Sequence, residues 1–382
     1  GSSVGVAVDA RDHVFVINLI DSFEPRTEIG LVASPPSSEC CAPAPNVLEF
    51  DAQGTLVGHW GGAGQGFAWP LQNHGLSIDS KESVWIGGSG GYDSQLLRFT
   101  REGSFLMAAG KATPLPAAVP PAPVVADTTY QGAGRAAAPP PAAGRGGGRG
   151  RGGRGAGPTL PPSSGSMESF GGPAKVGFDG SANEAYVADG IRNHRVVVID
   201  VETGAIKRFW GAYGNKPDDS PAAPYNPDGP PSQQFGVVRC AEPSKDGFVY
   251  VCDRTNDRIQ VFRKDGSFVK EKIIAPKTRG AGSVWDLTFS RDAQQRFIYV
   301  ADGANMKVHI LDRQSLEILT SFGDGGRQPG EFFGVHSIAT DSKGNIYTVE
   351  SYEGKRVQKF VYKGLGAVTS PSRGVPWPGS AR

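Results

Sequence analysis

The chain has 382 residues, with 39 lysines and arginines against 38 aspartates and glutamates, so its formal net charge is +1 at pH 7. A charge this balanced excludes a global electrostatic field that would recruit nucleic acid or an anionic membrane. No apolar run approaches the roughly 18 residues that a membrane-spanning helix needs, so we also expect no transmembrane segment.

One sequence unit is repeated six times along the chain. Its clearest copy is GEFFGVHSIATDSKGNIYTVESYEGKRVQKF, residues 330–360. A Gly/Phe lead-in precedes an alternating apolar strand, a D-x-x-G turn and a second strand. An acidic residue, a basic residue and a third strand follow. A unit of this length cannot bury both faces of its own small sheet, so the copies must stack on one another to form a core.

The copies begin near residues 4, 74, 174, 236, 283 and 334. Apolar and polar residues mostly alternate with period two, and clusters of Asp, Gly and Lys separate the runs, which is typical of hairpins. Helical periodicity is nearly absent. Four antiparallel strands per copy and six copies in a ring predict an all-β fold, a six-bladed β-propeller over residues 1–366.

A D-x-x-N-x-R/K turn follows the second strand of several copies. It is present as Asp253/Asn256/Arg258 and Asp302/Asn305/Lys307, and with one extra residue as Asp189/Asn193/Arg195. Asp and Asn side chains satisfy backbone N–H groups in tight turns, and the basic residue can pair with an acidic neighbour. Because the turn recurs from copy to copy, whereas a catalytic site would not, we predict a structural role for it.

Two long segments and a tail interrupt the repeats. Residues 111–170 hold a Pro/Ala tract and then an Arg/Gly tract, and form a low-complexity insertion between blades two and three. Such a composition buries too little apolar surface to offset its ordering entropy. Residues 211–234 form a second loop, and 367–382 form a C-terminal tail. An Arg/Gly tract can bind nucleic acid, but we favour a protein partner or self-assembly through the loops and the 111–170 insertion.

The four cysteines fall into two pairs. Cys240 and Cys252 flank a turn, so paired strands would place them opposite each other, as a disulfide or as two core thiols. Cys40 and Cys41 are adjacent in a Pro/Ser-rich loop, which leaves open a vicinal bridge, a bridge between chains or free thiols. The chain also begins almost directly with a strand, as if an upstream segment had been removed. We therefore expect an exported protein, secreted or periplasmic in a bacterium.

The repeat also predicts which residues line the central channel. Counting back five residues from the aligned acidic position of each inner strand gives Val4, His74, Ala174, Arg239, Trp285 and His336. The next positions are Gly5, Gly75, Lys175, Cys240, Asp286 and Ser337. A packed channel does not require two histidines, an arginine and a tryptophan. We therefore predict a ligand-binding channel mouth formed by His74, Lys175, Arg239, Trp285, Asp286 and His336.

The turn motif, the W/F-G-x-x-G…F lead-in and the repeat spacing resemble the NHL-repeat family of six-bladed propellers. Within that family, NHGLSID (73–79) and GVHSIATD (334–341) resemble the peptidyl-α-hydroxyglycine amidating lyases. The resemblance implies a zinc ion held by three histidines from three inner strands, with an arginine and a tyrosine near the metal. It also implies a structural calcium ion held by inner-strand carbonyl groups.

Only part of that implied site is present. His74 and His336 match two of the zinc ligands, but the third position is Arg239. The positions of the catalytic arginine and tyrosine hold Leu19 and Ile191. A zinc lyase needs three protein ligands and an open position, and a guanidinium repels a cation. We therefore expect no zinc and no catalytic residues, while the implied calcium would bind the carbonyl groups of Val6, Leu76 and Ser337.

The function that these patterns favour is an exported, non-catalytic scaffold that binds a ligand or a protein partner. Arg239 between His74 and His336, with Lys175 and Trp285, suits a small anionic ligand such as a carboxylate. The alternative is a metal-dependent lyase or hydrolase of the amidating-lyase type, with a reworked site at the channel mouth. Ser-His-Asp, P-loop and dinucleotide-binding motifs are absent from the sequence.

Overall fold

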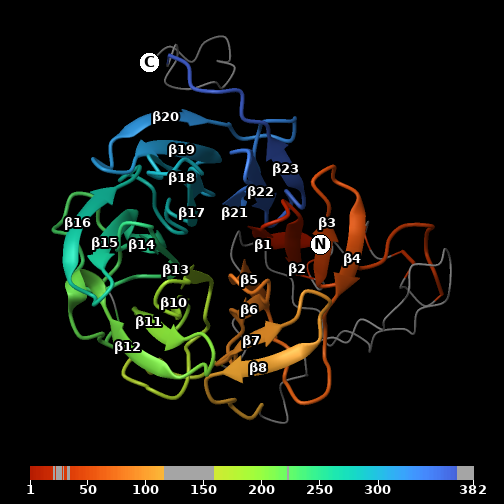
Figure 1. The fold of residues 1–382 in the computed structure, drawn as a ribbon, viewed down its shortest axis with the longest axis horizontal. Coiled ribbons are helices and arrows are strands. Elements are labelled where there is room, and N and C mark those ends of the chain that lie inside the picture. The colour runs from red at the N-terminus through yellow and green to blue at the C-terminus, as the bar shows by residue number, and fades with distance from the viewer. Residues whose placement is uncertain are drawn as a thin grey trace.

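The computed structural model describes residues 1–19, 22, 28, 30–31, 35–115, 159–221 and 223–367. The described strands form six antiparallel sheets, which follow one another around a ring (Figure 1). This confirms the predicted six-bladed β-propeller. The Arg/Gly tract at 144–156 and almost all of the predicted tail lie outside the described residues.

The first three blades each have four strands. Blade one contains β1 (Ser2–Val8), β2 (Val14–Leu19), β3 (Val47–Phe50) and β4 (Leu56–Trp60). Blade two contains β5 (Asn73–Ile78), β6 (Val84–Gly88), β7 (Leu96–Phe99) and β8 (Phe105–Ala109). Blade three contains β9 (Val176–Asp179), β10 (Glu184–Asp189), β11 (Arg195–Asp200) and β12 (Ile206–Trp210).

The remaining blades complete the ring. Blade four contains β13 (Val238–Pro243), β14 (Phe248–Asp253), β15 (Arg258–Arg263) and β16 (Phe268–Ile273). Blade five contains β17 (Asp286–Phe289), β18 (Phe297–Asp302), β19 (Lys307–Asp312) and β20 (Ile318–Phe322). Blade six contains β21 (Val335–Thr340), β22 (Ile346–Glu350) and β23 (Val357–Phe360).

The sixth blade departs from the predicted four strands. Its described part has three strands, in the order β21-β22-β23, because residues 361–367 pair with no strand.

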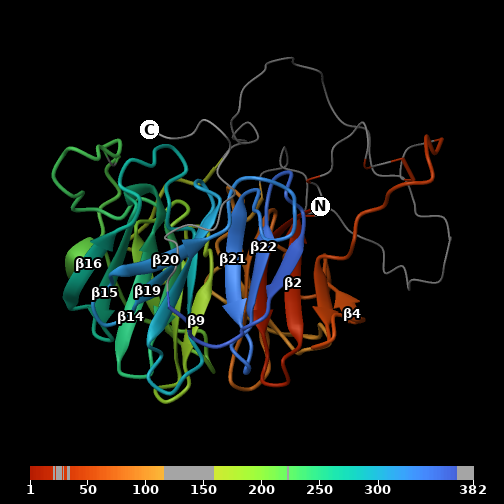
Figure 2. The ribbon, with the colours of Figure 1, turned by 90° about the horizontal axis from the view of Figure 1, so that it is seen from above.

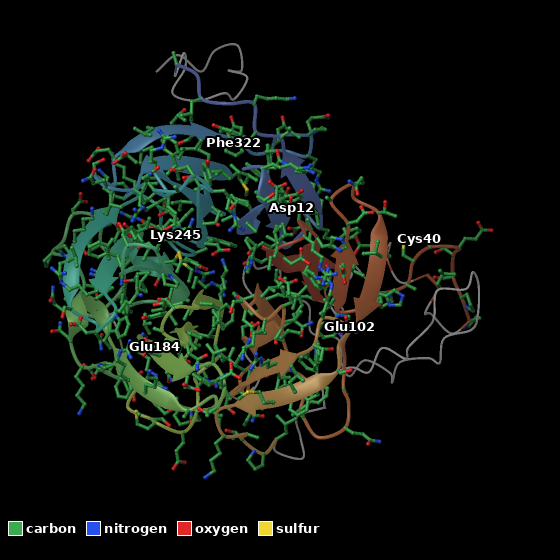
Figure 3. The ribbon with its side chains drawn as sticks, viewed as in Figure 1. Asp12, Cys40, Glu102, Glu184, Lys245 and Phe322 are labelled. Atoms are coloured by element: carbon green, nitrogen blue, oxygen red, sulfur yellow. A yellow bond between two sulfur atoms is a disulfide. The ribbon has the colours of Figure 1, made fainter. Side chains whose placement is uncertain are left out.

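Figure 3 labels one side chain in each of blades one to five. In that order they are Asp12, Glu102, Glu184, Lys245 and Phe322. The helices of the described part are the short 3₁₀ turns Ala212–Gly214 and Arg254–Asn256, and neither could cross a bilayer.

The hydrophobic core lies between the blades, as the repeat requires. Each core cluster joins residues of two neighbouring blades rather than the two faces of one sheet. The cluster between blades six and one contains Val6 and Val16 of the first blade with Ala339 and Val349 of the sixth. Apolar packing therefore closes the ring, with the strands running from one face of the propeller to the other (Figure 2).

The recurring acidic turn has the structural role predicted for it. Asp253 accepts hydrogen bonds from the Asn256 amide at 2.8 Å, the Arg258 guanidinium at 2.9 Å and the backbone N–H of Gly236 at 2.8 Å. The last bond attaches the end of a blade's second strand to the lead-in of its first strand. Blade five differs, because Nε2 of His309, rather than the Lys307 ammonium, lies next to the Asp302 carboxylate, at 3.1 Å.

The propeller includes more of the 111–170 segment than its composition suggests. Residues 159–170 pack on blade three, where the fully buried Arg195 donates hydrogen bonds to the carbonyl groups of Ser164, Ser166 and Ser169. Phe170 is also buried. Both ends of the 111–170 segment thus belong to the propeller rim, since the Lys111 N–H bonds the Glu168 carbonyl group at 2.6 Å.

Irregular pairing of the inner strands creates the channel mouth. In blade four, Val238 pairs with Asp253 and Cys240 pairs with Cys252, so Arg239 has no partner on β14. The same shift in register leaves His336 without a partner in blade six. A β-bulge of this kind turns the extra residue away from the regular alternation. Similar shifts occur at the predicted ring positions of blades one and two.

Candidate functional site

Three side chains from three blades meet where the inner strands begin. One Arg239 nitrogen contacts Nε2 of His74, and the other guanidinium nitrogen lies 3.5 Å from Nε2 of His336. The centroids of the two imidazole rings are 5.0 Å apart. All three side chains are at least nine-tenths buried. The structure therefore brings together the ring-position residues predicted from the repeat.

The backbone at two other ring positions orients the histidines. Nδ1 of His74 lies 2.9 Å from the Ala174 carbonyl oxygen, and Nδ1 of His336 lies 2.8 Å from that of Val4. A carbonyl oxygen can only accept, so each Nδ1 carries the hydrogen and each neutral ring presents the Nε2 lone pair to Arg239. Burial, followed by the Arg239 charge, lowers the pKa of both imidazoles well below the usual value, which favours these neutral forms.

Arg239 is a buried cation that forms no ion pair with an acidic group of the described residues. Its hydrogen-bond partners among the described residues are the two histidines, and neither carries a negative charge. Burial, and then the charge of Arg254, lower the pKa of Arg239. A buried cation is normally paired with an anion, because removing a charge from water is costly.

Arg254 and Tyr352 join the site although the sequence reasoning did not select them. The Arg254 guanidinium lies over the Trp285 ring, 5.1 Å from its centroid, and Tyr352 meets the same ring edge-on at 6.2 Å. Trp285 also lies edge-on to His336, with centroids 5.5 Å apart. We call His74, Arg239, Arg254, Trp285, His336 and Tyr352 the mouth cluster. Their position in the repeat could have indicated them, since Arg254 and Tyr352 closely follow the acidic residue that ends the second strand of their blades.

The other two predicted site residues form a separate charged group next to the mouth cluster. The Lys175 ammonium lies 2.8 Å from Asp286 and 2.9 Å from Glu242, and Ser337 donates a hydrogen bond to Asp286 at 2.7 Å. Burial opposes the charge of Lys175, but Asp286 and Glu242 outweigh it and raise the pKa of the ammonium. Burial also raises the pKa of Glu242. Lys175 is therefore occupied by carboxylates, unlike Arg239.

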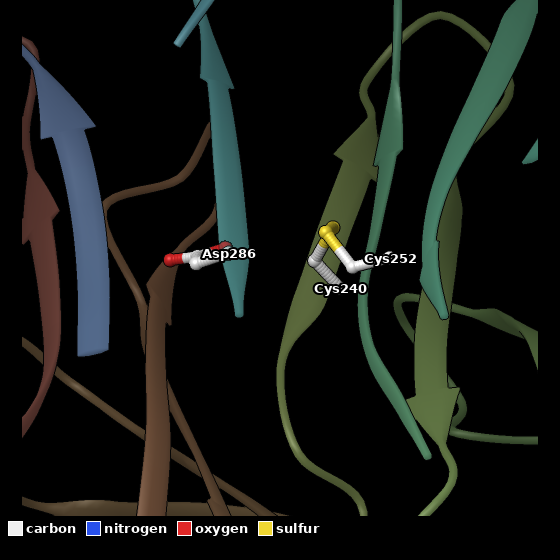
Figure 4. Close-up of side chains that lie close together, drawn as sticks. All are labelled: Cys240, Cys252 and Asp286. Carbon is white, nitrogen blue, oxygen red and sulfur yellow. A yellow bond between two sulfur atoms is a disulfide. The ribbon is translucent and has the colours of Figure 1, made fainter. Parts of the chain in front are cut away.

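A disulfide links two residues that are close in the chain to Arg239 and Arg254. Cys240 and Cys252 are bonded across β13 and β14, with Cα atoms 4.9 Å apart, which decides between the two states left open by the sequence. Ligand atoms of the two cysteines and of Asp286 all lie within 4.8 Å of one another (Figure 4). These three residues do not offer a metal two thiolates, because the sulfur atoms are bonded to each other. Cys40 and Cys41 are likewise paired in their exposed loop.

The positions implied by the amidating-lyase resemblance lack the catalytic side chains. Leu19 ends β2, and Ile191 packs against the apolar cluster between blades three and four. The residues proposed to bind calcium through their carbonyl groups lie on the adjacent strands β1, β5 and β21: they are Val6, Leu76 and Ser337.

Comparison with solved structures supports the fold, whereas comparison with family models and curated proteins finds no match. No protein-family model and no curated protein matches the sequence, so the resemblance to NHL repeats and amidating lyases is not confirmed. A Bacteroides thetaiotaomicron protein of unknown function is similar in structure, with 12% identity, a TM-score of 0.51, and 94% of this chain and 69% of that chain covered. At this identity the likeness shows the fold alone.

Two lyase structures show weaker similarity. Virginiamycin B lyase from Staphylococcus aureus has 12% identity and a TM-score of 0.47, with 95% of this chain and 85% of that chain covered. A streptogramin B lyase has 12% identity and a TM-score of 0.46, with 94% and 92% covered.

Proposed function

We propose that this protein is a non-catalytic ligand-binding propeller whose mouth cluster binds a small anion such as a carboxylate. The supporting observation is Arg239, a buried guanidinium held between two neutral imidazoles with no acidic hydrogen-bond partner among the described residues. An anionic oxygen would supply the missing charge and accept two parallel hydrogen bonds from the guanidinium. The bound ligand would thus supply the negatively charged partner that the described residues do not give Arg239.

A metal-dependent lyase is the alternative, and the residues present do not fit its zinc. Zinc would need the Nε2 lone pairs of His74 and His336, yet both face the Arg239 guanidinium. The third zinc-ligand position holds Arg239, whose guanidinium is itself a cation and cannot bind zinc. The arrangement also disfavours the implied calcium ion near Ser337. Asp286, which accepts a hydrogen bond from Ser337, already pairs with the Lys175 ammonium, and this positive charge would repel a cation.

We further propose that the protein acts in an oxidising compartment outside the cytoplasm. Two paired sets of cysteines support this, since disulfides persist in secreted and periplasmic proteins. A protein partner or self-assembly through the 111–170 insertion and the 211–234 loop is part of the same proposal. The connection 211–237 leads from β12 to the start of β13 and so lies at the face of the mouth cluster.

Calorimetric titration with acetate and inorganic phosphate in a low-chloride buffer tests the anion site. We expect saturable binding to the wild-type chain and at least about tenfold weaker binding to Arg239→Gln, equivalent to about 1.4 kcal/mol. Arg263→Gln removes an exposed arginine at the end of β15 and should bind as the wild type does. Elemental analysis is the second readout: a zinc ion that is lost in His74→Ala would favour the alternative enzyme.

A further inference from the structure

The mouth cluster contains a second cation, Arg254, that has no acidic partner in the part of the chain that the structure describes. Arg254 begins the 3₁₀ turn after β14, and its guanidinium lies over Trp285. Its Nε is buried and makes no hydrogen bond to any described residue. Burial lowers the pKa of this guanidinium, and no carboxylate among the described residues forms an ion pair with it. Arg254 is thus in the same electrostatic condition as Arg239.

Two acidic groups next to the mouth arginines are already engaged: Asp253, which precedes Arg254 in the chain, and Asp286, whose charge acts on Arg239. Asp253 accepts from Gly236, Asn256 and Arg258. Asp286 is held by Lys175, by the Ser337 hydroxyl and by the backbone N–H of Ile338. Neither carboxylate is therefore free to neutralise the two mouth arginines, which leaves two positive charges at one end of the channel.

Both arginines are held on one rigid part of blade four. Arg239 immediately precedes Cys240 on β13, and Arg254 follows Cys252 by two residues, in the turn after β14. The disulfide therefore links the backbone next to both arginines. A chain of contacts through His336 and Trp285 connects the two guanidinium groups on the channel side. Two like charges held close together repel each other, and the attraction of both to an anion between them offsets this repulsion.

We propose that the mouth cluster binds a dianion, with Arg239 and Arg254 each contacting one part of its negative charge. This inference rests on the proposed anion-binding function and specifies its ligand. A ligand with two negative charges balances two guanidinium groups, whereas a monoanion leaves one of them unpaired. Tyr352, which is 56% exposed, packs edge-on against the Trp285 ring that Arg254 covers.

Two chemical forms share this charge: a single doubly charged oxyanion and a dicarboxylate. We would compare sulfate with methyl sulfate, and succinate with monomethyl succinate, because each ester removes one charge from its parent. The dianion of at least one pair should bind the wild-type chain about tenfold more tightly than its ester. Preference for sulfate would indicate a single oxyanion between the arginines, and preference for succinate would indicate two separated carboxylates.

The variant Arg254→Gln identifies the second charge. It should reduce the preference for the dianion to about threefold or less, while Arg263→Gln keeps the wild-type preference. An unchanged preference in a folded Arg254→Gln protein would contradict the assignment. Equal binding of dianion and ester by the wild type would overturn the dianion proposal but leave anion binding in place. Failure to bind any of these anions would instead refute the proposed function. Since the ester comparison uses the wild-type chain, it decides even where a variant fails to fold.

Discussion

At the scale of single residues, the channel mouth is built from both backbone carbonyl groups and side chains. Val4 and Ala174 have apolar side chains, yet their carbonyl oxygens hold Nδ1 of His336 and His74. This fixes which nitrogen of each imidazole faces Arg239. A ring position can therefore contribute to a site through its carbonyl group, even where its side chain offers no chemistry.

A second residue-scale feature is the buried carboxyl of Asp257. It lies in the left-handed region with φ of 53° and is fully buried, and its carboxylate accepts a hydrogen bond from the Ser283 backbone N–H at 2.8 Å. Burial raises its pKa to about 7. A carboxyl whose folded-state pKa exceeds its unfolded value contributes stability at low pH, and that contribution is lost as the pH rises towards 7.

We predict that Asp257→Asn raises the free energy of unfolding at pH 8 by roughly 1–3 kcal/mol relative to the wild type. Asparagine adopts the same backbone conformation readily and carries no charge to bury. The gain should shrink as the pH falls from 7 to 4, because the wild-type carboxyl then becomes protonated in the unfolded chain as well as in the folded state. Chemical denaturation across this pH range measures it, with the exposed Asp265→Asn as the control. A gain that does not depend on pH would contradict the explanation.

At the scale of strands, close contact between inner strands depends on glycine. A Cβ at Gly75 would lie 1.9 Å from the Ala174 carbonyl oxygen, and one at Gly5 would lie 2.9 Å from the Leu76 nitrogen. These glycines let the bulged strands β1 and β5 approach each other, and let β5 approach the backbone at Ala174. The same Ala174 carbonyl group also orients His74.

We therefore predict that Gly75→Ala lowers the free energy of unfolding by about 3 kcal/mol, because the methyl group meets backbone that cannot move aside. It should also weaken anion binding by displacing the Ala174 carbonyl group from His74. Gly165→Ala is the matched control, since a Cβ there meets no atom within 4 Å. Thermal unfolding and calorimetric titration give the two readouts. Wild-type stability in Gly75→Ala would show that the inner strands are not in contact as described.

At the scale of the whole molecule, the ring is closed by contacts between its first and last blades. The Ser2 hydroxyl donates to the Tyr352 carbonyl group at 3.0 Å, and Ser342 donates to Asp12 from its backbone N–H at 2.8 Å. These bonds join residues from opposite ends of the described chain. The propeller therefore positions the mouth cluster from blades two, four, five and six at once.

Replacing residues 116–158 by a short Gly/Ser linker should leave both the melting temperature and anion binding unchanged. The reason is that both flanks of the segment are attached to the rim, where the Leu160 N–H bonds the Gly91 carbonyl group at 2.9 Å and Lys111 bonds Glu168. If the insertion mediates assembly, light scattering should show that the shortened chain is smaller in solution than the full chain. A large loss of thermal stability would mean that the segment forms part of the core.

The sequence by itself determined the fold, the ring positions and the structural turns. Alternation with period two and a unit too small to form its own core require stacked blades. The repeat register then identified His74, Arg239 and His336 as equivalent positions, and the structure brings these side chains together.

Only the tertiary structure decided the chemistry at the mouth. Arg254 and Tyr352 do not share the ring position of Arg239 in the repeat. They reach it through Trp285, which packs on His336, the neighbour of Arg239. Strand pairing likewise decided between a disulfide and free thiols at Cys240 and Cys252. The physical reason is that burial, charge pairing and tautomer depend on which neighbours the ring brings close, and local periodicity does not encode those neighbours.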